Sequence, residues 1–149
     1  MTIQMTALTA LLLCVPVLPD DISERAKLLG SWQVQDDSGK EPAVWVLEVK
    51  GMALHISESR GDMKISEFEC VPKGAECEGT IAGNKATVSM YYDGPALVQL
   101  ETKGSDVTRR RFTVTGPPDL MDIEVVPIVG VGKAETLHLK RIKISAGIR

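Results

Sequence analysis

The sequence is poor in aromatic side chains and has little excess charge. Its 149 residues include two Trp, two Tyr and two Phe, so a folded core must be built mainly from aliphatic side chains. The net charge is only −3, which offers no basic surface to the phosphate backbone of nucleic acid or to an anionic membrane. We therefore expect no nucleic-acid partner.

Histidine is also scarce, which limits the catalytic chemistry that the chain can support. A Ser or Cys nucleophile needs a nearby base, and only His55 and His138 are available. Each alternates with apolar neighbours, so both are expected on the solvent-facing sides of strands. They would form part of a metal site only if their strands were neighbours, and two isolated histidines make a poor one. We expect no catalytic residue, no metal and no cofactor, and the chain is not predicted to be an enzyme.

No apolar run is long enough to cross a bilayer, which takes about 20 residues. Residues 1–19 carry no charged side chain and contain the apolar run 10–18. This pattern predicts a secretory signal peptide, and no membrane span in the mature chain. The leader is atypical, because it has no Lys or Arg before the run and no Ala-x-Ala site after it. We expect export to the periplasm, the cell surface or the medium.

A lipid anchor is not expected at the end of this leader. Leu11-Leu12-Leu13-Cys14 resembles a lipoprotein box, but Leu13 stands where Gly, Ala or Ser is usual. Cys14 is more simply a member of the apolar run.

Removal of the leader leaves two of the three cysteines, Cys70 and Cys77. The C-x6-C spacing is neither the redox spacing nor half of a zinc site. Pro72 and Gly74 between them favour a turn. In an oxidising compartment this arrangement predicts a structural disulfide across the end of a hairpin.

The remaining chain reads as one all-β domain preceded by a short helix. Asp21 and Glu24 are placed to begin a helix that Gly30 ends. From Ser31 onward, short alternating apolar runs are separated by turn residues, which indicates eight or nine antiparallel strands in up-and-down order. The fold is expected to be a barrel, with a β-sandwich as the alternative. The domain is predicted over 20–144, with a tail at 145–149.

Two local features of the strands have structural meaning. The apolar phase shifts between Ile65 and Phe68, which predicts a β-bulge near Ser66-Glu67. The run Arg109-Arg110-Arg111 is split by alternation. Arg109 and Arg111 are expected to form a cross-strand charge ladder with Asp122 and Glu124.

Arg110 shares the other face with apolar side chains, so it is expected to point inward. There it would either pair with an internal acid such as Glu58, the usual fate of a buried charge, or neutralise the carboxylate of a ligand.

Leu29-Gly30-Ser31-Trp32, which follows the predicted helix, resembles the Gly-x-Trp motif that opens the lipocalin-like (calycin-type) barrels. In that family a late Arg packs over the Trp, and Arg141 stands at the matching place. The stretch 28–42 also resembles small lipocalin-like domains of exported bacterial proteins. The resemblance implies a closed eight-stranded barrel with a small hydrophobic ligand in its mouth, and structural roles for Gly30, Trp32 and Arg141.

These observations lead to two hypotheses of function. The first is a non-enzymatic exported domain that binds a small hydrophobic ligand inside the barrel. Its expected lining is Trp45, Leu54, Met90, Tyr92, Leu100, Arg110 and Phe112. The second is a solid-core envelope domain that contacts a protein partner through a sheet face or strand edge.

Overall fold

The computed structural model describes residues 21–36, 39–116 and 119–143. The predicted leader, 1–19 with Cys14, and the predicted tail, 145–149, lie outside the described residues. Within the described part of the chain, no helix has the length and apolar character needed to cross a membrane.

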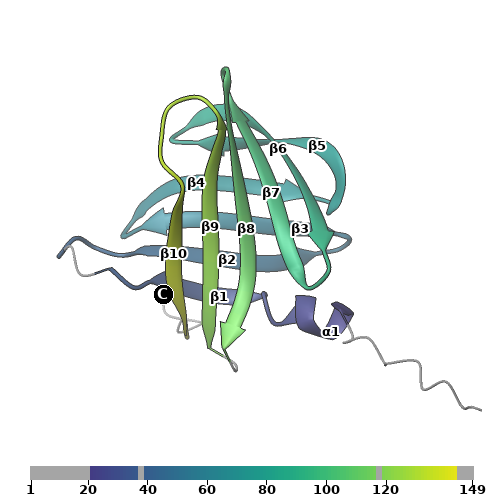
Figure 1. Ribbon diagram of the computed structural model, residues 1–149, viewed down its shortest axis with the longest axis vertical. Coiled ribbons are helices and arrows are strands. Elements are labelled where there is room, and N and C mark those ends of the chain that lie inside the picture. Colours follow the sequence, from purple (N-terminus) through teal and green to yellow (C-terminus); the bar gives the residue numbers. More distant parts are fainter. Residues whose placement is uncertain (1–20, 37–38, 117–118, 144–149) are drawn as a thin grey trace, which may run out of the picture.

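In the described residues, ten antiparallel strands form a closed barrel preceded by one short helix (Figure 1). Each strand pairs with the next along the chain, and β1 pairs with β10 to close the ring. The predicted all-β class, up-and-down order and N-terminal helix are confirmed, and the strand number exceeds the expected eight or nine. The elements are α1 (Asp21–Ala26), β1 (Gly30–Val34), β2 (Ala43–Lys50), β3 (Ala53–Arg60), β4 (Met63–Cys70), β5 (Lys73–Ile81), β6 (Asn84–Asp93), β7 (Ala96–Lys103), β8 (Asp106–Gly116), β9 (Leu120–Val129) and β10 (Glu135–Ile142).

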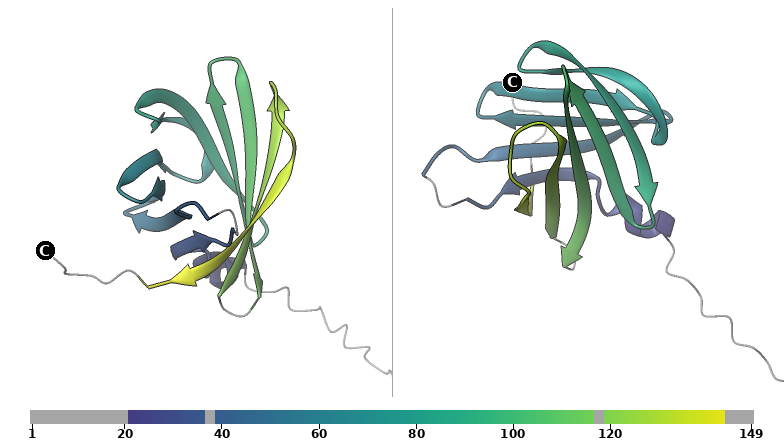
Figure 2. Two further views of the ribbon diagram at one scale, coloured as in Figure 1. Left: turned by 90° about the vertical axis from the view of Figure 1, so that its left-hand side faces the viewer. Right: turned by 45° about the horizontal axis from the view of Figure 1, so that its top comes forward.

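Apolar and polar side chains alternate along the strands, so that one face of the closed sheet is apolar and lies inside the barrel. In β2, Ala43, Trp45 and Leu47 are buried while Glu48 and Lys50 are exposed. The same period of two recurs in β3 and β6, as expected for strands with one face on the core. The two views of Figure 2 show the sheet curling round until its first and last strands meet. The apolar side chains therefore converge inside the ring.

The pairing of β4 with β5 is the shortest in the barrel. It comprises only three residue pairs, from Ser66↔Ile81 to Phe68↔Gly79. Continuing the same register places Cys70 opposite Cys77, and their Sγ atoms form a disulfide with the Cα atoms 5.7 Å apart. The predicted bridge therefore joins two strands just beyond the point where their hydrogen-bonded ladder stops.

A β-bulge lies next to this weak pairing, close to its predicted position. Glu58 pairs with Ser66, but Ser59 pairs with Lys64, so Ile65 is the extra residue on β4. Its carbonyl accepts a hydrogen bond from the backbone N–H of Ala82 at 2.7 Å. The bulged residue is therefore tied to the next hairpin.

The end of the barrel near α1 is closed by Arg141 and Trp32. The Arg141 Cζ lies 4.2 Å from the centre of the Trp32 ring, which is the contact that the family resemblance implies. The guanidinium also donates to the carbonyls of Leu29 at 2.7 Å and Lys27 at 2.8 Å. A Cβ at Gly30 would lie 2.5 Å from Arg141 Nη1, so only glycine leaves room for this guanidinium.

Candidate functional site

The half of the barrel nearest α1 is a solid apolar core. Its inward side chains come from most of the strands, and each is at most 2% exposed. The members of this core are Trp32, Leu47, Leu54, Ile56, Phe68, Met90, Leu97, Phe112, Met121, Ile123 and Leu139.

Polar side chains replace this core toward the opposite end of the barrel. We call Glu58, Ser66, Gln99, Glu101 and Arg110 the inner polar cluster. Glu58 pairs with Ser66 across β3 and β4, and Gln99 pairs with Arg110 across β7 and β8. Because β3 and β8 are five places apart in a ring of ten strands, the cluster brings together opposite walls.

Arg110 is the centre of the cluster. Its Nη1 donates to Glu101 Oε2 in an ion pair whose two side chains are 17% and 11% exposed. Its Cζ lies 5.7 Å from the centre of the Trp45 ring, and that ring meets Phe112 edge-on at 5.6 Å. Arg110 therefore points inward as predicted, but Glu101 rather than Glu58 is its ion-pair partner.

Glu58 is a second carboxylate facing this single guanidinium. Burial raises the pKa of its carboxyl above the ordinary value of 4.5; Arg110 and Arg60 oppose the rise, and Glu101 adds to it. Glu58 has no ion-pair partner among the described residues. The inner polar cluster thus holds more acid than base.

Three buried polar atoms at the cluster form no hydrogen bond with the described residues. They are Trp45 Nε1 and both amide atoms of Gln99, Nε2 and Oε1. Buried polar groups are almost always hydrogen-bonded in native proteins, and one left unpaired costs about 1–3 kcal/mol. The cluster therefore offers two kinds of free donor and one free acceptor to a molecule inside the barrel.

Most of the seven predicted lining residues face the interior, but only two of them lie at the inner polar cluster. Trp45 and Arg110 belong to the polar half, whereas Leu54, Met90 and Phe112 belong to the solid core.

Tyr92 is only half-buried and lies toward α1, where Arg25 stacks over its ring at 4.5 Å. Burial raises the pKa of its hydroxyl.

The placement of Leu100 in the lining was wrong. Leu100 pairs with Arg109 and Ser89 on the outer face, while its neighbours Gln99 and Glu101 are buried at 1% and 9% exposure. A hydrophobic reading of β7 favours Leu100 as the inward residue, because it is apolar and its neighbours are polar. The correct assignment follows from the position of Leu97. Side chains two and four residues after an inward-facing residue of a strand also face inward, and these are Gln99 and Glu101.

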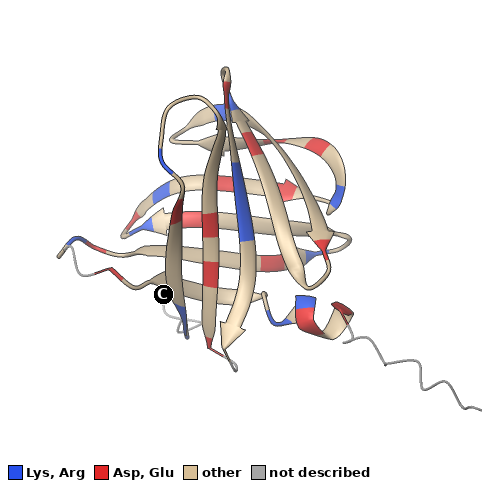
Figure 3. Ribbon diagram, viewed as in Figure 1, with Lys and Arg blue, Asp and Glu red and all other residues tan. Residues whose placement is uncertain are grey.

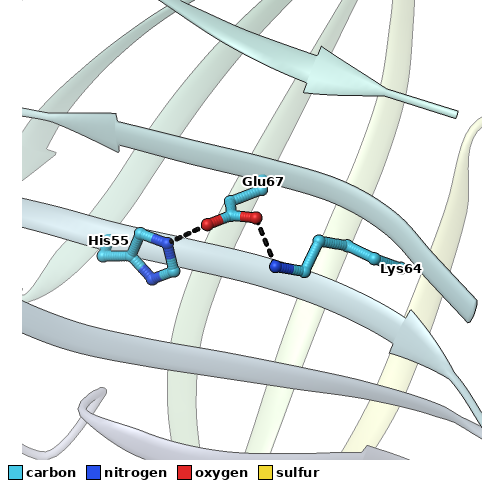
Figure 4. A network of polar contacts seen from close by, with 3 residues as sticks. All are labelled: His55, Lys64 and Glu67. Atoms are coloured by element: carbon cyan, nitrogen blue, oxygen red, sulfur yellow. Dashed lines mark hydrogen bonds and ion pairs between the residues drawn. The ribbon is translucent and has the colours of Figure 1, made fainter. Parts of the chain in front are cut away.

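The two histidines lie on the outer face of the barrel, on strands β3 and β10, which are three places apart in the ring and do not pair with each other. His55 Nε2 and Glu67 Oε1 are 2.8 Å apart, and Lys64 also donates to Glu67 (Figure 4). The hydrogen bonds from Lys64 and His55 lower the pKa of Glu67. His138 Nδ1 is 2.8 Å from Asp122 Oδ1 on β9. In the part of the chain that the structure covers, no group of three potential ligands could hold a metal ion.

The outer arginines of β8 form ion pairs, though only partly in the predicted ladder. The blue band of β8 in Figure 3 runs beside the red bands of β9. Arg109 lies 3.6 Å from Glu124, as expected. Arg111 pairs instead with Asp93 at 2.6 Å, and Asp122 is engaged by His138. These charges are structural and lie outside the barrel.

Comparison with known proteins adds information on the fold alone. No protein-family model and no curated protein sequence matches this chain. Among solved structures, the chain is similar to secretory abundant heat soluble protein 4 from Ramazzottius varieornatus, with a TM-score of 0.65, 17% identity, and coverage of 78% of this chain and 96% of that one. It is also similar to fatty-acid-binding protein 1 of Echinococcus granulosus, with a TM-score of 0.64, 9% identity, and coverage of 79% and 99%.

A third similar structure is the Schistosoma mansoni fatty acid binding protein in complex with arachidonic acid. The TM-score is 0.62 and the identity 13%, with 80% of this chain and 99% of that one covered. At such identities the likeness establishes a shared closed β-barrel fold. These similar structures include fatty-acid-binding proteins and a REP1-NXSQ fatty acid transporter.

Proposed function

We propose that this protein is a non-enzymatic binding protein that holds a small apolar ligand inside its barrel, at the inner polar cluster. The observation that carries the proposal is the unmet hydrogen-bonding capacity of Trp45 Nε1 and the Gln99 amide, which lie inside the barrel next to its apolar core. Ligand sites are typically apolar with a few convergent polar groups. The similarity to fatty-acid-binding proteins adds support.

A dye-binding measurement tests the location of this site. Nile red, a neutral dye that fluoresces in apolar surroundings, should bind the protein with a fluorescence increase. Ser66 lies within the cluster and is 5% exposed, so Ser66→Phe should fill the site and weaken dye binding by about tenfold or more. Ser89→Phe is the matched control, because Ser89 pairs with Leu100 on the outer face of β6.

Equal dye binding by both variants would place the dye outside the barrel and contradict the proposal. Far-UV circular dichroism and the indole N–H resonance of Trp45 verify that each variant is folded. If Ser66→Phe does not fold, the wild-type resonance decides: a Trp45 signal that stays fixed at saturating dye rules out binding at the cluster. That outcome would favour the solid-core interaction domain.

We also propose that the protein works after export. The charge-free leader-like segment 1–19 and the Cys70–Cys77 bridge support an oxidising compartment. Expression of the full chain in a secreting host, followed by native mass spectrometry of the exported protein, should yield a mass without the leader and with two hydrogens fewer for the disulfide. Retention in the cytoplasm with both thiols reduced would contradict export.

A further inference from the structure

The charges of the inner polar cluster restrict the chemistry of the ligand's head group. We infer that the barrel takes an apolar ligand whose head group is an uncharged hydroxyl or amide, and that it discriminates against a carboxylate. This inference rests on the proposed function and deepens it. The inferred ligand differs from the fatty acids named for the similar structures, which carry a carboxyl group.

The charged groups that face the site come from three strands. β7 provides Glu101, β8 provides Arg110 and β3 provides Glu58, while Arg60 lies exposed at the tip of β3. The residues that pair with these cluster members from the neighbouring strands are uncharged: Trp45, Ile81, Val88 and Val125. One strand further on, the carboxylate of Glu135 lies opposite Val125 at an exposed position of β10.

Arg110 is not free to receive an acid. Its guanidinium is already bonded to Glu101, and Glu58 lies near enough for Arg110 to act on its charge. A ligand carboxylate would be the third acid beside one base in a partly desolvated space, where like charges repel strongly. The burial that raises the pKa of Glu58 already shows that this space disfavours negative charge.

The unpartnered atoms match a neutral head group. Trp45 Nε1–H and the Gln99 amide nitrogen donate, whereas Gln99 Oε1 accepts. A hydroxyl or an amide can both accept and donate hydrogen bonds. Such a head group can therefore accept from the Trp45 and Gln99 N–H groups and donate to Gln99 Oε1. An ionised carboxylate only accepts and would leave Gln99 Oε1 unpaired. Hydrogen bonding and charge therefore favour the same class of ligand.

A pair of ligands with the same tail tests the inference. Octan-1-ol and octanoate are titrated separately into 15N-labelled protein at about pH 7.5, where octanoate is ionised. The protein has two Trp residues, and their indole N–H signals provide a reporter and a control. Trp45 Nε1 is the reporter, whereas Trp32 Nε1 donates to the Leu28 carbonyl at 2.9 Å near α1.

Octan-1-ol should shift the Trp45 signal, leave the Trp32 signal in place, and bind with a dissociation constant about tenfold or more below that of octanoate. Equal or tighter binding of octanoate would overturn the inference but leave the proposed function standing. If neither compound moves the Trp45 signal, the proposed function itself is wrong and the inference falls with it.

A variant that neutralises one acid of the cluster should bind octanoate more tightly. Loss of a residue with a purely structural role would not increase binding. Glu101→Gln releases Arg110 from its ion pair, so octanoate should bind about tenfold more tightly than to the wild type. Glu124→Gln is the matched control, because it removes the partner of Arg109 on the outer face, and it should change neither affinity. If Glu101→Gln does not fold, Glu58→Gln is used, which keeps the ion pair and should improve octanoate binding by about threefold. Unchanged octanoate binding in a folded variant would overturn the inference.

Discussion

Glu58 is a residue whose charge state is governed by the fold around it. Its carboxyl is taken out of water by the walls of the barrel and faces Glu101, while Arg110 and Arg60 offset part of the cost. The net effect is a raised pKa, so the folded chain holds this proton more tightly than the unfolded chain does. By linkage, a raised carboxyl pKa stabilises the fold at low pH, and this contribution is lost as pH rises through the pKa of the folded state.

Replacement of this one carboxyl therefore gives a pH-dependent stability change. Glu58→Gln should be more stable than the wild type at neutral pH, because glutamine has no proton to lose. The difference should shrink as pH falls and vanish below the ordinary value of 4.5. Urea unfolding at a series of pH values measures it. Glu76→Gln, at an exposed position of β5, should stay within about 0.5 kcal/mol of the wild type, and a Glu58→Gln variant no more stable at neutral pH would contradict the cluster as described.

For single residues, the sequence predicts that Arg110 points into the barrel, but it does not identify the residues that Arg110 contacts there. Arg110 could be assigned to the interior because it alternates with Phe112, whose burial is easy to predict. Gln99 and Glu101 could not, because polar side chains in a strand normally mark the solvent face, and Leu100 between them is apolar. Only the closed barrel, which brings β7 beside β8 in a fixed register, shows that these polar side chains are paired inside.

Among the elements, β5 departs most from the sequence-based expectation. Pro72 and Gly74 predict a turn at the start of the stretch Lys73–Ile81. The structure instead shows one strand, whose first four residues are all exposed. A strand with so little apolar alternation gives no period-two signal. Its place in the barrel is set by neighbours: β6 pairs along most of its length, and the disulfide ties it to β4.

Reduction of the disulfide should therefore weaken the β4–β5 contact more than any other. Closing so short a loop stabilises by about 2.5 kcal/mol in the chain-entropy model, and the three-pair ladder has little to replace it. Treatment of the wild type with a phosphine reductant should lower the free energy of unfolding by about that amount. Amide hydrogen exchange should accelerate in β5 first. Because reduction removes no heavy atom, it separates the effect of the cross-link from the effect of deleting the buried Cys70 sulfur.

Cys70→Ala/Cys77→Ala provides the complementary control, since it removes the sulfur atoms as well as the bond. It should lose about 1 kcal/mol more than reduction alone, owing to the small cavity left at Cys70. Exchange that accelerates equally in all strands would show that β4 and β5 are not a local weak point.

For the whole molecule, the decisive contact is the one between the first and last strands. β1 pairs with β10 over four residues, from Ser31↔Ile142 to Val34↔Leu139, and Arg141 then covers Trp32 from the end. Closure gives each of the ten described strands a partner on both sides, so none of them is an edge strand. It also brings the start of β1 beside the end of β10, far apart in sequence. The resemblance of Gly30-x-Trp32 and Arg141 to the motif of lipocalin-like barrels implies this contact, whereas no comparable motif marks the other strand pairs.

Closure predicts that the chain tolerates a change in the order of its strands. A circular permutant would join residue 143 to residue 21 through about ten Gly and Ser residues, a span of up to roughly 30 Å. Its new termini would open the β7–β8 turn between Gly104 and Ser105. Every strand pair of the closed barrel survives this rearrangement, so the permutant should fold cooperatively within about 2 kcal/mol of the wild type, with unchanged Trp32 and Trp45 indole signals. A second permutant opened between Arg110 and Arg111, inside β8, should lose the fold, because it interrupts the ladders to both β7 and β9. If the first permutant unfolds as readily as the second, the ends of the barrel do not meet as the β1–β10 register requires.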